Sequence, residues 1–189
     1  MLLNIDLKYL KKVQLTVIMS LLIFFLGLQF YFWYKTENVK PYLAIVPNLP
    51  SEHMVKAFSF GDEELYFRTQ AFKLQNAGDT YGRVTPLKDY DYEKLYKWFK
   101  ILDNLDPKSN YVPSLAAYYY SQVQDTEQTI YIIDYLEEHA DKNPEKNWWW
   151  YYQAMYIASY VYKDKDRALE LADKLSKTSG ENAPFWTKH

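Results

Sequence analysis

The sequence predicts an all-α protein in which one N-terminal transmembrane helix precedes a solenoid of about three helical hairpins. Three observations support this fold class. Residues 13–34 form an uncharged apolar segment, apolar residues recur at helical spacing in the rest of the chain, and similar proline-containing turns return after 37 and 40 residues. Hydrophobic residues make up 49% of the 189-residue chain and aromatic residues 19%, which is enough apolar surface for a packed core.

Residues 13–34 are the predicted membrane segment. A helix of this length is about 33 Å long and can cross a hydrocarbon core of about 30 Å. The segment ends in FYFWYK, a group of aromatic residues and a lysine that is typical of a membrane–water interface. A cleaved signal peptide is the alternative. We expect an uncleaved anchor, because the apolar run is long and no small-x-small cleavage motif follows it closely.

The lysines that flank this segment predict its orientation. The slight excess on the N-terminal side, together with the terminal amine, places residues 1–12 in the cytoplasm. The short anchor and the lack of an organelle-targeting signal favour a bacterial inner (cytoplasmic) membrane, with the C-terminal domain periplasmic or otherwise extracytoplasmic. The flanking residues are Lys8, Lys11 and Lys12 before the segment, and Lys35 and Lys40 after it.

The charge of the remaining chain limits the class of partner. After Lys35 there are 18 basic and 23 acidic residues, a formal charge of −5. Proteins that bind nucleic acid usually present a basic patch, so we expect no nucleic-acid partner. The same acidic charge favours a domain that is held away from an anionic bilayer surface.

Residues 35–59 are predicted to form a proline-containing linker. Pro41, Pro47 and Pro50 each fix their own φ angle and disfavour helix in the preceding residue. We therefore expect an extended spacer, with a short helix from Ser51. The helical domain would then cover residues 60–189.

Helical signals recur through this domain. Asp62 is a good N-cap for a first helix that stops at Gly78. Later helices are predicted over residues 92–106, 109–123, 129–143, 146–162 and 166–180. The apolar phase is set by Leu95, Trp98, Phe99 and Leu102, and a shift of 37 residues gives Ile132, Tyr135 and Leu136, then Leu169 and Ala172. The same shift aligns Ala117 with Ala154 and Tyr119 with Tyr156.

Over about residues 60–180 this pattern resembles the tetratricopeptide (TPR) family of helical repeats. The best local match is YKDKDRALELADKL, Tyr162–Leu175, which has the turn and the Ala-Leu pair of a repeat's second helix. The small residues of the first helices lie outside the family's register, and the first hairpin has a long link, so the repeats are degenerate. The resemblance implies a right-handed helical solenoid that binds peptides or protein surfaces, usually without catalysis.

The run NWWWYY raises the question of what five adjacent large aromatic side chains do. Successive residues of a helix are rotated by 100°, so these side chains cannot all face one side. A helix that is apolar all round is normally buried, which favours a structural role in the core. The alternative is that some rings line a groove, because Trp and Tyr are favoured anchors in protein interfaces. The candidate rings are Trp148, Trp149, Trp150 and Tyr152, together with Tyr118 and Tyr119.

Two further segments are candidate recognition sites. Residues 78–92 form a long link between the first two helices, where Arg83 or Lys88 is available to meet a carboxylate or phosphate and Asp79 is a further candidate. A packing role for this loop is the alternative, and a phosphate-binding loop is disfavoured because the GK[ST] ending is absent. The C-terminal NAPFWTKH resembles the start of another first helix, so Phe185 and Trp186 are candidates for a docking surface.

The sequence offers no catalytic motif and implies no cofactor or metal. Cysteine is absent and the histidines are single, which excludes thiolate sites and a histidine pair at helical ligand spacing. We therefore expect a membrane-anchored scaffold or accessory subunit that binds one or more membrane-associated proteins and is not an enzyme. Two alternatives remain: an extracytoplasmic glycan- or cell-wall-binding module that uses aromatic residues, and an enzyme subunit whose site the sequence does not locate.

Overall fold

The computed structural model describes residues 7–37, 44–80, 83–178 and 183–188. The chain divides into two compact units, Met1–Leu43 and Ala44–His189. The described residues are helical apart from connecting segments and one pair of two-residue strands, which confirms the all-α class.

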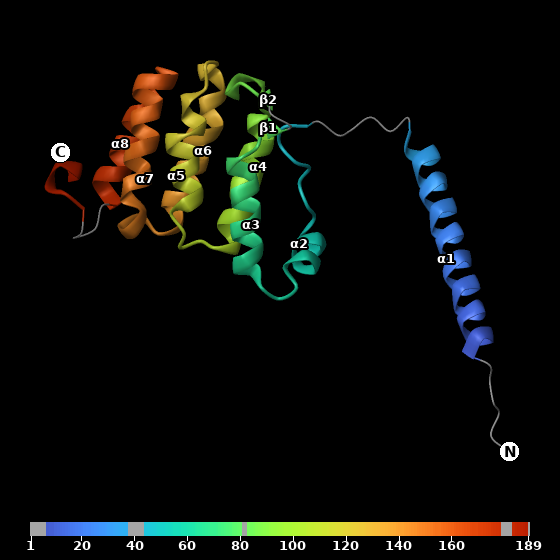
Figure 1. Cartoon of the computed structure of the whole chain (residues 1–189). Coiled ribbons are helices and arrows are strands. Elements are labelled where there is room, and N and C mark those ends of the chain that lie inside the picture. Colours follow the sequence, from blue (N-terminus) through green and yellow to red (C-terminus); the bar gives the residue numbers. More distant parts are fainter. Residues whose placement is uncertain (1–6, 38–43, 81–82, 179–182, 189) are drawn as a thin grey trace. The chain divides into compact units, whose positions relative to one another are not determined.

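The first unit contains the single helix α1, Leu7–Thr36 (Figure 1). Its stretch Lys12–Thr36 is long and apolar enough to cross a membrane, and none of that stretch is buried. Length and composition alone do not separate an anchor from a signal sequence, because both meet the same test. The structure therefore supports one candidate membrane-spanning helix at the predicted place.

The second unit begins within the stretch that was expected to be a linker. Residues 44–50 pack along the helices without regular secondary structure, with Val46 buried, and the Trp98 indole N–H donates a hydrogen bond to the Pro47 carbonyl at 2.9 Å. Helix α2, Glu52–Ser59, follows with Ser51 as its N-cap. It ends at Phe60, which adopts the left-handed conformation (φ 49°) and is 90% exposed.

Helix α3, Glu63–Gln75, begins as the sequence predicts, because the Asp62 carboxylate accepts a hydrogen bond from the Leu65 backbone N–H at 2.9 Å. The link to the next helix contains the antiparallel strands β1, Asp79–Thr80, and β2, Arg83–Val84. A short 3-10 turn, Leu87–Asp89, completes it.

Five more helices complete the second unit in two layers. Each helix packs against the next along the chain; α5 packs against both α3 and α7 in one layer, and α4 packs against α6 in the other. Figure 1 shows these helices as a stack that runs from α4 to α8, with α5 and α6 overlapping in this view. Their bounds are α4 Tyr92–Leu105, α5 Tyr111–Tyr118, α6 Ile130–Lys142, α7 Pro144–Tyr156 and α8 Lys165–Thr178.

Ion pairs fix α8 against α6 in the second layer. The Arg167 guanidinium lies 3.0 Å from the Asp134 carboxylate and also pairs with Glu137. Two turns further along α8, Lys174 Nζ lies 2.7 Å from Glu137 and 3.4 Å from Asp141. Because Glu137 is itself buried, these contacts also neutralise a carboxylate that has been removed from water.

The end of α7 departs from regular α-helix. Ile157–Tyr162 form a π-helical turn, which closes at Lys163 in the left-handed conformation (φ 64°). The Asp164 backbone N–H donates to the Ala158 carbonyl at 2.9 Å, and its carboxylate then caps α8 by accepting from the Arg167 N–H. The connection from α7 to α8 is consequently very short.

The core is rich in tyrosine as well as aliphatic residues. Tyr120 lies at its centre, where its hydroxyl donates to the Leu74 carbonyl at 2.6 Å and its ring packs on Phe99. The Tyr92 hydroxyl donates to the Tyr120 carbonyl at 2.8 Å. Burial raises the pKa of Tyr92 and Tyr120 well above the ordinary tyrosine value.

The predicted helical phase holds in α4 and α6 and fails in α8. Leu95, Phe99, Ile132 and Leu136 are all fully buried. In α8 the buried positions are Ala168, Leu171 and Leu175, and Leu169 is 68% exposed, so the expected phase for Leu169 and Ala172 is wrong. After the π-helical turn and the short connection that follows it, α8 packs with a different side of the helix toward the core. An alignment at a constant shift of 37 residues does not take this rotation into account.

Candidate functional site

A row of aromatic side chains lies along the outer side of α7. Trp149, Tyr152, Tyr156 and Tyr160 are spaced by three or four residues, so they share one side of the helix and its π-helical turn. The ring centroids of Trp149 and Tyr152 are 5.2 Å apart, and those of Tyr156 and Tyr160 are 4.9 Å apart. Tyr152 is half-buried and the other three are exposed.

Rings from other elements extend this row. The Trp149 indole N–H donates to the hydroxyl of Tyr118, at the end of α5, at 2.9 Å. Trp186, in the C-terminal 3-10 turn Phe185–Lys188, lies with its ring 5.3 Å from Tyr152 and 6.1 Å from Trp148. We call the whole group the aromatic surface: Tyr118, Trp148, Trp149, Tyr152, Tyr156, Tyr160 and Trp186.

Two hollows flank Tyr152 on this surface. The first, of about 360 Å³, lies between α5 and α7 and is lined by Tyr118, Trp149, Tyr156 and Gln153 among others. The second, of about 530 Å³, lies between α7, α8 and the C-terminal turn, with Leu169 and Trp186 in its wall. Aromatic rings beside hollows of this size are the usual form of a site that accepts side chains or rings of a ligand.

The polar groups of the aromatic surface are neutral, and many are unpaired. The first hollow has no charged residue in its lining. Within the described part of the chain, the indole N–H groups of Trp148 and Trp186 have no hydrogen-bond partner, and neither do the hydroxyls of Tyr156 and Tyr160. These groups are available to an incoming ligand, and most of them can act as donors.

The NWWWYY run is divided between core and surface. Trp150 is only 5% exposed, and its indole N–H donates to Asn110 at 3.2 Å, whereas its neighbour Trp149 is 36% exposed. Tyr151 is buried, with its hydroxyl hydrogen-bonded to Asp141. Trp150 therefore belongs to the core, and the structure brings Trp148, Trp149 and Tyr152 together with Tyr118 and Trp186 on the outside.

Two other predicted rings lie apart from this group. Tyr119 is exposed, but its ring packs edge-on against the core ring of Tyr120, 5.0 Å away, on the side of the 78–92 link. Phe185 is exposed and makes no aromatic contact among the described rings. Tyr156 and Tyr160 were missed as site residues, although their spacing from Trp149 is visible in the sequence.

The 78–92 link is tied to the core at its base. The Tyr90 hydroxyl donates a hydrogen bond to the Ala77 carbonyl beside Gly78, whose φ is +82°. Burial, followed by the nearby Tyr119, raises the pKa of Tyr90 to about 12. Asp79 and Lys88 are exposed and form no ion pair with any side chain that the structure describes, and the Arg83 side chain lies outside the described residues. The structure describes no contact between Asp79 and Lys88.

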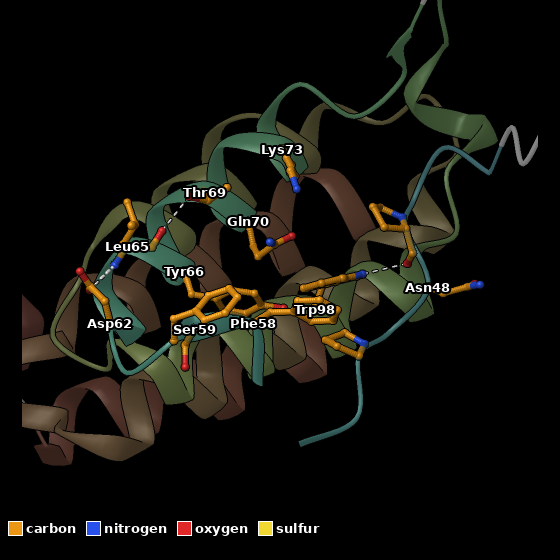
Figure 2. Close-up of a pocket in the computed structure, with 13 residues that line it drawn as sticks. Asn48, Phe58, Ser59, Asp62, Leu65, Tyr66, Thr69, Gln70, Lys73 and Trp98 are labelled. Atoms are coloured by element: carbon orange, nitrogen blue, oxygen red, sulfur yellow. Dashed lines mark hydrogen bonds between the residues drawn. The ribbon is translucent and has the colours of Figure 1, made fainter. Parts of the chain in front are cut away.

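A third hollow, of about 540 Å³, lies at the other end of the helical unit, between residues 47–50, α2 and α3 (Figure 2). Figure 2 shows Trp98, Tyr66 and Phe58 in its wall, with the hydrogen bond from the Trp98 indole to the Pro47 carbonyl along one side. The sequence did not indicate this hollow, because residues 44–50 were expected to be a free linker. Here an indole N–H and aromatic faces already hold a proline-containing segment.

A buried polar cluster joins α4 to α6. His139 Nδ1 lies 2.7 Å from Asp103 Oδ1, and Lys142 Nζ lies 2.8 Å from Asp103 Oδ2. Both Asp103 and His139 are buried. The nearby Tyr135 hydroxyl is buried, and burial, followed by the charge of Asp103, raises its pKa well above the ordinary value. The cluster is closed to a substrate and acts as a structural link.

Among the residues that the structure describes, no group of three or more His, Asp or Glu side chains is arranged to hold a metal ion. No family model, curated protein or solved structure matches the chain.

Proposed function

We propose that this protein is a membrane-anchored helical module that binds a protein partner through the aromatic surface. The observation that carries the proposal is the group of contacting rings outside the core, with Trp149, Tyr156 and Trp186 exposed beside two hollows. Large exposed apolar patches are uncommon on monomeric proteins and often mark interaction sites. Trp and Tyr are also the residue types that contribute most to binding energy in interfaces.

The TPR-like solenoid is part of the proposal. Its support is the two-layer order of the helices and the matched burial of positions 37 residues apart. Ala117 and Ala154 are both buried, and Tyr119 and Tyr156 are both exposed. The layer of α3, α5 and α7 would then present its outer side to a partner, and Trp149 and Tyr156 lie on this layer.

The proposal places α1 as an uncleaved anchor in a bacterial inner membrane, with residues 1–12 cytoplasmic and the helical unit outside the cytoplasm. Anchoring would raise the local concentration of the aromatic surface near membrane-associated partners. The chain contains no cysteine, so a single Phe72→Cys variant reports the location of the helical unit. A membrane-impermeant maleimide is expected to label it in intact cells, and an N-terminal epitope tag is expected to remain on the protein. Loss of the tag would identify a signal sequence, and protection of the cysteine would reverse the orientation.

Site-specific photocrosslinking in native membranes tests the binding role. A photoreactive phenylalanine analogue is placed at position 149 or 156, and at position 72 on α3 as an exposed control. We expect a discrete protein adduct from positions 149 and 156 and not from position 72, identified by mass spectrometry. If positions 149 and 156 give no protein adduct above the level at position 72, the proposed function is wrong.

A second candidate is a glycan-binding module, and the uncharged row of rings along α7 favours it. Sugar rings stack on exposed aromatic faces, and rings spaced by one helical turn can contact successive sugar units. Titration of the full chain with chitin or cellulose oligosaccharides, followed by tryptophan fluorescence, tests this candidate. A saturable change that is lost in Trp149→Ala would support it, and a flat titration would reject it.

A further inference from the structure

We infer that the segment recognised by the aromatic surface is an extended, proline-rich peptide in the polyproline II conformation. The inference rests on the proposed function, because it names the chemistry of the partner at the same site. Three features of the described residues carry it: an uncharged hollow between α5 and α7, unpaired indole donors, and an internal example of the same contact.

The first hollow selects a neutral partner segment, whereas Asp173 is the charged residue in the wall of the second hollow. The hollow between α5 and α7 has no charged residue in its lining, although the chain after Lys35 carries a formal charge of −5. An acidic or basic peptide would find no opposite charge in this hollow to compensate for its lost hydration. A peptide segment without charged side chains has a small desolvation cost in this hollow, so an uncharged segment is the partner that it favours.

The hydrogen-bonding groups select a partner that offers acceptors. Proline has no backbone N–H, so a proline-rich segment presents carbonyl oxygens and needs donors from the protein that binds it. The indole N–H groups of Trp148 and Trp186 meet this need, since neither has a hydrogen-bond partner among the described residues. Carboxylates, which commonly accept hydrogen bonds from sugar hydroxyls, are missing from the first hollow. Trp186 lines the second hollow, so its indole donor is placed to meet a carbonyl oxygen of a proline-rich segment there.

The protein itself contains an example of this contact. The Trp98 indole N–H donates to the carbonyl of Pro47, in the segment that also contains Pro50, and both prolines line the hollow of Figure 2. The apolar faces of Trp98 and Tyr66 lie beside this segment. The same combination of indole donor and aromatic face is available, without an occupant among the described residues, on the aromatic surface.

The length of the aromatic row sets the length of the peptide. From Trp149 to Tyr160 the helix axis advances by about 16 Å at 1.5 Å per residue. A polyproline II helix advances by about 3.1 Å per residue, so five or six residues cover the row. The preformed conformation of such a segment reduces the entropy lost on binding, which favours recognition by a shallow surface.

The test is binding of a fluorescein-labelled decaproline peptide to the full chain in lipid nanodiscs, measured by fluorescence anisotropy. A glycine-serine peptide of equal length is the peptide control. We expect saturable binding of decaproline only, weakened at least tenfold in Trp149→Ala. Trp148→Phe and Trp186→Phe keep an aromatic ring and lose the donor, and each should weaken binding about fivefold, the usual effect of one hydrogen bond. Phe72→Ala removes an exposed ring elsewhere and should leave the affinity unchanged.

Several outcomes overturn the inference. Decaproline that binds no better than the glycine-serine peptide would reject it, as would equal affinity in the wild type and both Trp→Phe variants. Circular dichroism of each variant ensures that a loss of binding is not a loss of fold. A protein adduct at position 149 together with no decaproline binding overturns this inference alone, whereas the absence of a protein adduct overturns the proposed function.

Discussion

The close contact between Gly78 and Tyr90 predicts that the single methyl group added in Gly78→Ala lowers the stability of the helical unit substantially. Gly78 has a φ of +82°, and a Cβ atom built there would overlap the Tyr90 hydroxyl and lie 2.8 Å from its Cζ. Gly61 has nearly the same backbone conformation, with a φ of +85°, and a Cβ atom there meets nothing within 4 Å. The two glycines therefore form a matched pair that differs in the space around the new methyl group.

The magnitudes follow from this comparison. Placing alanine at positive φ costs about 1 kcal/mol, which is the whole effect expected for Gly61→Ala. In Gly78→Ala the Tyr90 ring must also move, which breaks its hydrogen bond to the Ala77 carbonyl and disturbs a buried side chain. These two effects add about 2 kcal/mol, so we expect a total loss of about 3 kcal/mol.

Thermal unfolding of both variants, followed by far-UV circular dichroism in the same nanodiscs and at the same heating rate, measures the difference. An additional 2 kcal/mol corresponds to a Tm about 4–8 °C lower for Gly78→Ala than for Gly61→Ala in a protein of this size. Gly78→Ala combined with Tyr90→Phe removes the overlapping hydroxyl and should recover part of the loss. Equal Tm values for the two glycine variants would refute the packing role of Tyr90.

Three other predictions follow from neighbouring contacts. Trp150→Ala should destabilise the helical unit by about 3–5 kcal/mol and Trp149→Ala by less than about 1 kcal/mol, because only Trp150 is buried. Chemical denaturation measures the free energy of unfolding of the two variants. Similar losses would contradict the division of the NWWWYY run between core and surface. Asp103→Asn removes the carboxylate that His139 contacts at 2.7 Å and should cost about 2–4 kcal/mol by the same assay, with an unchanged midpoint as the contrary result. Folding raises the pKa of Tyr90 from about 10 to about 12, so the stability that this residue contributes is complete below pH 10 and is lost as the pH rises toward 12. In an alkaline titration the helical circular dichroism signal and the tyrosinate absorbance should therefore change together. Full tyrosine ionisation without loss of helix would contradict this prediction.

Local chemistry made much of the fold predictable. The apolar run of residues 13–34 lies within α1, and the carboxylate of Asp62 caps α3, because both features depend on residues adjacent in the chain. The buried phase of α4 was also predictable from Leu95 and Phe99, since its helix is regular and its turns are marked by prolines and acids. Signals of this kind remain valid whatever the distant parts of the chain do.

Features that depend on long-range contacts were not predictable in the same way. Asp103 on α4 pairs with His139 on α6, 36 residues further along the chain, and neither residue type alone indicates a buried partner. The burial of Trp150 beside the exposed Trp149 depends on where α5 and the C-terminal turn pack against α7. The π-helical turn Ile157–Tyr162 has no turn signal of its own, and the helix that follows it consequently buries another face than the repeat pattern predicted.

Replacement of Phe60 is expected to give a more stable and more soluble protein. A phenylalanine in the left-handed region is under backbone strain, and at 90% exposure its ring gains little from packing. Asparagine tolerates this backbone conformation and is soluble, so Phe60→Asn should raise the melting temperature and reduce self-association in the same step. The natural sequence keeps the phenylalanine in spite of this strain. A growth competition between cells that carry the wild-type protein and cells that carry Phe60→Asn would therefore measure any benefit of the ring that a stability measurement misses.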